Sequence, residues 1–126
     1  MMGYLLDTNA VLWCMDRPER LRGEVRELIE DRRNPIYISA AGTWEMSVKH
    51  ALGRLELPLD IRPVLEQMGI RTLPVTVDHA HVVRSLPPIH RDPFDRIMIA
   101  QSKHDDLAMI TSDVTIAQYD IKTIMT

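Results

Sequence analysis

Short apolar runs alternate with longer amphipathic segments along most of the chain. A short run rich in β-branched and aromatic residues is typical of a buried strand, whereas an apolar residue at every third or fourth position predicts a helix with one buried face. On this basis we predict strands at residues 2–6, 36–38, 71–75, 108–110 and 121–125. We predict helices at residues 10–15, 19–33, 40–52, 60–68, 77–85, 93–104 and 115–118.

The helix predicted from Pro93 has an unusually well-defined start. Asp92 is a good N-cap, because its carboxylate can accept a backbone N–H of the first turn. Pro93 at the first helical position loses no hydrogen bond, and Asp95 in the first turn suits the positive end of the helix. The stretch is therefore either a well-capped core helix or a helix start that also presents Asp95 for chemistry.

Alternation of strands with helices predicts parallel pairing and an α/β fold, a three-layer α/β/α sandwich. We expect a mainly parallel sheet of four to five short strands within one domain spanning residues 1–126, a usual length for a single domain. The hydrophobic fraction of 45% is enough for a substantial core. The pattern alone does not determine the order of the strands.

Charge and cysteine content narrow the possible functions. A net charge of −3 is not typical of a passive nucleic-acid binder, but it is a weak guide where several acids surround a cation. The single cysteine, Cys14, excludes an internal disulfide and fits a reducing compartment. The chain has neither a signal-peptide pattern nor an apolar stretch near the ~20 residues that a membrane helix needs. We therefore expect a cytoplasmic protein without membrane association.

Four acids that are distant in the sequence are predicted to lie at one edge of the sheet. Asp7 directly follows the first strand, and Asp113 follows the strand at residues 108–110. Crossover helices run antiparallel to the strands, so that their N-termini also lie at the carboxyl edge. Asp95 falls in the first turn of one such helix and Glu45 in the second turn of another. Open α/β sheets bind ligands at this edge.

Carboxylates gathered in this way repel one another, and each raises the pKa of its neighbours. Protons, basic side chains or a metal ion must offset their charge at neutral pH. Hard oxygen ligands suit Mg²⁺ or Mn²⁺, and such an ion can activate water and polarise a phosphodiester. The arrangement therefore predicts metal-dependent phosphodiester hydrolysis.

Each acid also has a purely structural explanation. Asp7 can serve a turn, Asp113 can cap the turn before Ile116, and Asp95 can be a favourable first-turn acid. Glu45 can pair with Lys49 on an exposed helix face, which is worth about 0.3–0.5 kcal/mol. The convergence of all four on one edge favours a shared site, provided that the predicted topology holds.

Residues beside the four acids have structural interpretations that we favour. We interpret Asp92 as a cap, His90 as solvated in a proline-rich loop, and Lys49 and Arg96 as neutralising the acids or touching RNA backbone. Two roles fit four further polar residues: they can form turns and caps, or they can bind water and phosphate oxygens. These residues are Thr8, Asn9, Thr111 and Ser112. We interpret Trp44 and Phe94 as core residues rather than as stacking platforms for bases, and Cys14 as a small core residue.

Four motifs in order resemble the signatures of the PIN domain family. They are Leu5-Leu6-Asp7-Thr8-Asn9, Ser39 through Trp44-Glu45 with Lys49, Asp92-Pro93-Phe94-Asp95-Arg96 continuing to Ala100-Gln101, and Thr111-Ser112-Asp113. Two further segments, Gly53-Arg54-Leu55 and Leu57-Pro58, resemble the sequences of VapC-type toxins of prokaryotic toxin–antitoxin pairs. The resemblance covers nearly the whole chain.

The resemblance implies a Mg²⁺- or Mn²⁺-dependent ribonuclease with a parallel sheet covered by helices on both faces. Asp7, Glu45, Asp95 and Asp113 match the acidic quartet of the family, so they are the expected catalytic and metal-binding residues. Members of the family typically form homodimers. A cognate antitoxin silences them by placing its C-terminal segment in a groove near the active site.

Two other functions remain possible at this point. A phospho-acceptor domain of the response-regulator kind also gathers acids at a strand edge. That site would need an acidic neighbour for Asp7 and a lysine at a strand end, which this chain lacks. The other alternative is a non-catalytic RNA- or protein-binding module on a PIN scaffold. The intact acidic quartet argues against that reading.

Overall fold

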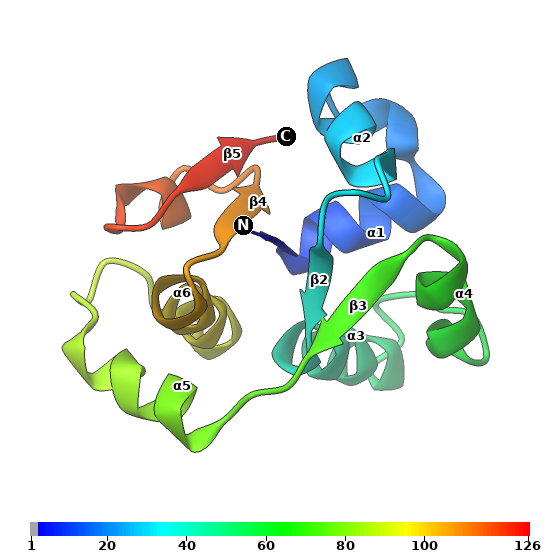
Figure 1. The fold of residues 1–126 in the computed structure, drawn as a ribbon. Coiled ribbons are helices and arrows are strands. Elements are labelled where there is room, and N and C mark those ends of the chain that lie inside the picture. Colours follow the sequence, from blue (N-terminus) through cyan, green and yellow to red (C-terminus); the bar gives the residue numbers. More distant parts are fainter. Residues whose placement is uncertain (1–2) are drawn as a thin grey trace.

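The protein forms one parallel sheet whose strand order differs from the order in the sequence. The computed structural model describes residues 3–126. The strands are β1 (Tyr4–Leu6), β2 (Ile36–Ser39), β3 (Ile70–Leu73), β4 (Ala108–Thr111) and β5 (Thr123–Met125). They pair in the order β3-β2-β1-β4-β5, and every pairing is parallel. The predicted parallel α/β fold is therefore confirmed, and β1 lies at the centre of the sheet (Figure 1).

Helices connect the strands and cover both faces of the sheet. They are α1 (Thr8–Asp16), α2 (Gly23–Glu30), α3 (Ala40–Ala51), α4 (Ile61–Gln67), α5 (Val77–Val82) and α6 (Pro93–Asp105). Three single turns of 3₁₀ helix are η1 (Pro18–Arg20), η2 (Val83–Ser85) and η3 (Ile116–Gln118). Within residues 3–126 none of the helices is both long and apolar enough to cross a membrane.

Alternation along the strands divides the core into two layers. Successive strand side chains point to opposite faces of a sheet. Leu6 and Ile110 accordingly pack in a cluster with residues of α1, α2 and α4, whereas Leu5 and Met109 pack in a second cluster with residues of α6. Figure 1 shows α1 and α2 on one side of the sheet and α5 and α6 on the other. The result is the predicted three-layer sandwich.

Several predicted boundaries need correction. The helix predicted at residues 19–33 is wrong in extent, because Pro18 starts a separate 3₁₀ turn and Leu21 is extended before α2 begins at Gly23. The strand predicted at residues 71–75 ends at Leu73, where Pro74 has no N–H for the sheet. The first strand begins at Tyr4 in the described part of the chain, and the predicted start at Met2 lies outside the described residues.

The local signals that position the site are confirmed. The Ser39 hydroxyl accepts a hydrogen bond from the backbone N–H of Ala41 and caps α3. Gly53 has φ +73° just after α3, a left-handed conformation that glycine adopts without steric cost. Asp7 is itself the N-cap of α1, so that this helix begins at Thr8, earlier than predicted. Strand ends and helix starts therefore meet at the carboxyl edge of β1 and its neighbours.

Candidate active site

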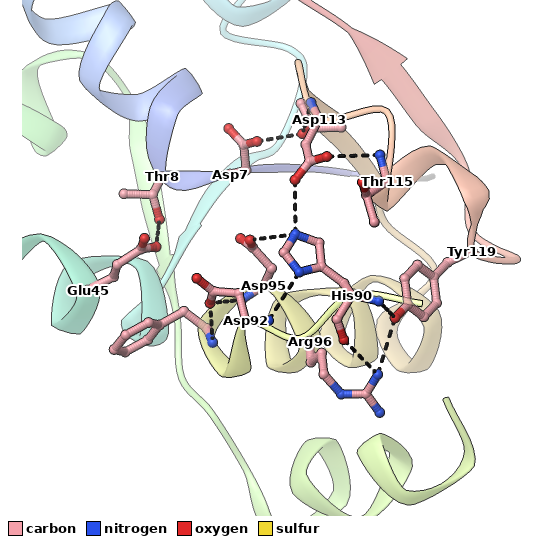
Figure 2. A network of polar contacts seen from close by, with 12 residues as sticks. Asp7, Thr8, Glu45, His90, Asp92, Asp95, Arg96, Asp113, Thr115 and Tyr119 are labelled. Carbon is pink, nitrogen blue, oxygen red and sulfur yellow. Dashed lines mark hydrogen bonds and ion pairs between the residues drawn. The ribbon is translucent and has the colours of Figure 1, made fainter. Parts of the chain in front are cut away.

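The structure brings the four predicted acids together at the carboxyl edge of the sheet. Asp7 follows β1, and Asp113 follows β4, the neighbour of β1 in the sheet. Glu45 comes from the second turn of α3, directly after β2, which is the other neighbour of β1. Asp95 comes from the first turn of α6. Figure 2 shows the four carboxylates around a common space.

Asp7 is the most rigidly held of the four acids. Its side chain is buried, and its Oδ1 accepts the backbone N–H of Ala10 at 2.8 Å. Its Oδ2 accepts the hydroxyl of Thr111 at 2.5 Å. Burial raises the pKa of Asp7, the bonds from Thr111 and Ala10 oppose this rise, and the charges of Asp113 and Glu45 add to it. The net pKa lies above its ordinary value.

Glu45 is buried and has one donor for each carboxylate oxygen. The Thr8 hydroxyl donates to Oε1 at 2.5 Å, and Lys49 Nζ donates to Oε2 at 2.9 Å. The predicted ion pair between Glu45 and Lys49 therefore forms. It does not draw Glu45 away from the acids, since Thr8 directly follows Asp7 and holds the carboxylate at the sheet edge.

Asp95 has a raised pKa, for which burial is the largest cause. Burial raises its pKa, the charge of Asp92 raises it further, His90 opposes the rise, and the charges of Glu45 and Asp7 add to it. The resulting pKa is about 7. Asp95 therefore exchanges its proton near neutral pH, which is the behaviour expected of a carboxyl group that shares a site with others.

Asp92 acts as the cap of α6, as predicted. Its Oδ1 accepts the backbone N–H groups of Phe94 at 2.8 Å and of Asp95 at 3.1 Å. These two bonds fix the start of α6 and with it the position of Asp95. The same hydrogen bonds of Asp92 therefore cap the helix and fix the position of Asp95.

The interpretation of His90 as a solvated loop residue is wrong. Its Nε2 lies 3.0 Å from Oδ2 of Asp113 and 3.1 Å from Oδ2 of Asp95 (Figure 2). Burial raises the pKa of Asp113, but hydrogen bonds from His90 and from the N–H of Thr115 outweigh this effect and lower it overall. The proline-rich sequence around His90 gives no sign of these contacts, because a loop position does not show where its side chain points.

The interpretation of Arg96 as a group that neutralises the four acids is also wrong. The guanidinium does not pair with the four acids but donates hydrogen bonds to the segment before α6. Its acceptors are the carbonyl groups of Val83, Leu86, Pro87 and His90 and the hydroxyl of Tyr119. Arg96 therefore attaches the proline-rich loop to α6.

The interpretation of Trp44 as a core residue is wrong. Its side chain is 64% exposed and packs edge-to-face against Phe94, with ring centroids 4.9 Å apart. Phe94 is half-buried, and Cys14 is half-buried against the first core cluster. Close to Trp44, α3 instead buries Met46.

Two threonines are functional neighbours whose role the sequence left open. Thr8 and Thr111 each donate a hydroxyl hydrogen bond to one of the acids, Glu45 and Asp7 respectively. Their positions beside Asp7 and just before Asp113 were a signal, but turn roles explained them equally well. Asn9 and Ser112 are exposed, and within residues 3–126 no side-chain bond to the four acids is recorded for them.

The donor set fits a hard divalent cation. Four carboxylates supply oxygen ligands of the kind that Mg²⁺ and Mn²⁺ prefer. In the described part of the chain, the basic side chains that contact these carboxylates are those of Lys49 and His90. Burial is the largest cause of the raised pKa of Asp7 and of Asp95, and the charges of neighbouring acids add to it.

A second histidine–acid cluster differs from this site in its chemistry. His79, His104 and Asp105 also place three possible metal ligands close together. However, Nδ1 of the buried His79 accepts the backbone N–H of Thr76, so that Nε2 must carry the hydrogen that faces Asp105. This imidazole has no lone pair available for a metal, and it serves the capping box of α5.

Comparison with known proteins gives one family match over most of the chain. The model of the PIN domain family matches residues 4–122. Ribonuclease VapC16 of Mycobacterium tuberculosis is 38% identical over 60 residues, which are 46% of this chain. The aligned region covers 43% of that relative, less than half of its length.

Several solved structures share the fold. A chain in the crystal structure of VapBC2 from Rickettsia felis, bound to a DNA fragment from their promoter, matches with a TM-score of 0.76 at 12% identity, over 98% of both chains. A chain of DNA-bound VapBC from Salmonella typhimurium matches with a TM-score of 0.73 at 15% identity, over 99% of this chain and 98% of that one. FitAcB from Neisseria gonorrhoeae matches with a TM-score of 0.65 at 26% identity, over 96% of each.

The capping role of Asp92 generates a first testable prediction. Asp92→Asn keeps an N-cap oxygen, so its free energy of unfolding should stay close to the wild-type value. Asp92→Ala loses the cap, and its free energy of unfolding should be lower by about 0.5–2 kcal/mol. Urea denaturation measures both values. If Asp92→Asn were destabilised as much as Asp92→Ala, then the charge of Asp92 rather than its cap would matter.

The raised pKa of Asp95 predicts that the metal-free protein loses stability as pH rises. Between the ordinary pKa of 3.8 and the folded-state value of about 7, the folded state binds more protons than the unfolded state. The free energy of unfolding in EDTA should therefore fall from about pH 5 to about pH 7 and then level off. Asp113 has a lowered pKa, so its effect on the free energy of unfolding has the opposite sign and is confined to pH values under about 4.

Asp95→Asn should make this dependence shallower. A residual slope of the same sign should remain, because the pKa of Asp7 is also raised. Asp16→Asn is the control, since Asp16 is exposed at the far end of α1 from Asp7. Urea denaturation across this pH range measures the slope. An Asp95→Asn slope equal to that of the control would contradict the assignment.

Proposed function

The chain belongs to the PIN domain family, and on that premise we propose that it is a metal-dependent endoribonuclease. It hydrolyses RNA phosphodiester bonds and acts as the toxin of a toxin–antitoxin pair. One observation carries the proposal: acids from four separate elements, Asp7, Glu45, Asp95 and Asp113, face one space at the carboxyl edge of the sheet. Structural roles for single acids do not explain this convergence.

These four carboxylates are the residues that would hold Mg²⁺, or Mn²⁺ in its place. When bound, such an ion supplies Lewis-acid activation of water and stabilises negative charge on the phosphate and the leaving oxygen. The protein fixes its own ligands in advance. Thr111 orients Asp7, Thr8 orients Glu45, and the cap at Asp92 fixes Asp95. Preformed geometry of this kind lowers the cost of assembling a reactive arrangement.

The burial of the acids favours one kind of RNA segment as the substrate. Asp7 and Glu45 are buried at the floor of the site, whereas Asp95 and Asp113 are partly exposed at its rim. A phosphate must approach this rim closely, which favours a flexible single-stranded segment over a stiff duplex. Lys49, with its side chain 44% exposed beside Glu45, can offset charge on the approaching backbone.

The proposed partners follow from the toxin role. The motif resemblance, together with the names VapBC2, VapBC and FitAcB of proteins that share the fold, supports a cognate antitoxin as partner. We extend the proposal to a homodimer that acts on RNA in the cytoplasm. Co-purification with the product of an adjacent reading frame tests the antitoxin, and light scattering of the purified chain tests the dimer. A chain that stays alone and monomeric would contradict both.

Cleavage of RNA by the purified protein tests the proposed activity. Mg²⁺ or Mn²⁺ should support cleavage and EDTA should abolish it. Asp7→Asn should lower the rate by about 100-fold or more, because the metal ion contributes several kcal/mol to the transition state. Gel analysis of a labelled single-stranded RNA measures the rate.

The matched control is Asp16→Asn, which removes an acid from the other end of the same helix. It should cleave RNA at the wild-type rate. Activity that survives EDTA or Asp7→Asn would overturn the metal mechanism. Failure of the wild-type protein to bind Mn²⁺ in calorimetry would instead favour a non-catalytic binding module on this scaffold.

A further inference from the structure

His90 joins two of the carboxylates that arrive from different elements. Asp95 belongs to the first turn of α6, and Asp113 belongs to the loop after β4. Nε2 of His90 lies 3.1 Å from the first and 3.0 Å from the second. The possible ligand atoms of the three side chains all lie within 4.8 Å of one another. One ring nitrogen therefore spans the gap between two acids of the proposed metal centre.

The surroundings of the ring determine which nitrogen carries the hydrogen. The backbone N–H of Asp92 is 3.1 Å from Nδ1 of His90, and a backbone N–H can only donate. Nδ1 must therefore accept, and Nε2 carries the hydrogen that faces Asp95 and Asp113. In this orientation Nε2 has no lone pair for a metal, so His90 is a donor to the ligands and not itself a ligand.

The backbone of His90 is held as firmly as its ring. Its N–H donates to the hydroxyl of the buried Tyr119 at 2.7 Å, and its carbonyl accepts from Arg96. The same guanidinium also bonds the Tyr119 hydroxyl at 3.2 Å. Arginine suits this role because its planar group presents several donors in fixed directions. The loop is thus attached to α6 and to the segment before β5, and it aims the imidazole at the acids.

Resting on the proposed function, we infer that His90 is a positioning residue of the metal centre. Its Nε2–H donates to the carboxylate of Asp113 and lies 3.1 Å from that of Asp95, and it keeps both in the orientation in which they would bind one divalent cation. Two carboxylates at this separation repel each other, and an N–H that donates to Asp113 beside Asp95 offsets part of that repulsion without adding a positive charge that would oppose the cation. Hydrogen-bond partners of metal ligands commonly set metal affinity in this way.

Calorimetric titration with Mn²⁺ tests this role with two substitutions. His90→Phe keeps a ring of similar size but removes the donor, and it should weaken Mn²⁺ binding by about 10-fold or more. His90→Gln places an amide N–H near the position of Nε2 and should restore affinity to within about threefold of wild type. Thermal unfolding of each variant separates a loss of affinity from a loss of fold.

The control is His81→Phe, which changes an exposed histidine of α5 and should leave Mn²⁺ affinity unchanged. Wild-type affinity in His90→Phe would overturn the inference while leaving the proposed function intact. Equal losses in the Phe and Gln variants, with unchanged thermal unfolding, would overturn the donor role. A wild-type protein that binds no Mn²⁺ would overturn the proposed function itself.

A measurement on the wild-type protein tests the inference even if His90→Phe does not fold. Nitrogen-15 NMR of the histidine rings should show His90 protonated at Nε2, both alone and with Mg²⁺ added. A ring protonated only at Nδ1, or one that loses its Nε2 hydrogen when Mg²⁺ binds, would overturn the positioning role.

Discussion

Repulsion among carboxylates at one edge of a parallel sheet is the constraint on which the rest of this structure depends. The topology delivers Asp7 and Asp113 from adjacent strand ends, and it delivers Glu45 and Asp95 from helix starts at the same edge. Burial, and after it the charges of the neighbouring acids, raises the pKa of Asp95 to about 7. Within the described residues the protein offsets the charge with hydroxyl groups, one lysine and one histidine. That response leaves a site suited to a divalent cation.

The same residues shape the fold and prepare the chemistry. Asp7 is at once the N-cap of α1 and an acid of the site. The cap at Asp92 starts α6 and places Asp95 one turn into the cluster. Arg96, in the same turn, attaches the loop that carries His90. Because each acid is held by a helix start or a strand end, its position depends on the packing of the whole sheet.

The sequence predicted the layers of the fold and the position of the four acids, because both follow from local signals. Strand alternation separates Leu5 from Leu6 before any contact is known, and an acid directly after a strand must lie at its carboxyl end. Strand order could not be predicted, since an apolar run does not specify its neighbour in the sheet. The helix predicted at residues 19–33 is too long, because the amphipathic pattern includes the end of the 3₁₀ turn at Arg20 and the extended Leu21. The contacts of His90 could not be predicted, because a position in a proline-rich loop, unlike an acid at a strand end or helix start, does not show where its side chain points.

A crystal of the protein grown with Mn²⁺ tests the central claim most directly, because the ion gives an anomalous scattering signal that locates it. The account predicts an anomalous peak at the carboxyl edge of the sheet, coordinated by carboxylate oxygens from the set Asp7, Glu45, Asp95 and Asp113. His90 should remain hydrogen-bonded to Asp113 without contacting the ion. An edge without a peak, or a peak confined to the cluster of His79, His104 and Asp105, would contradict the account.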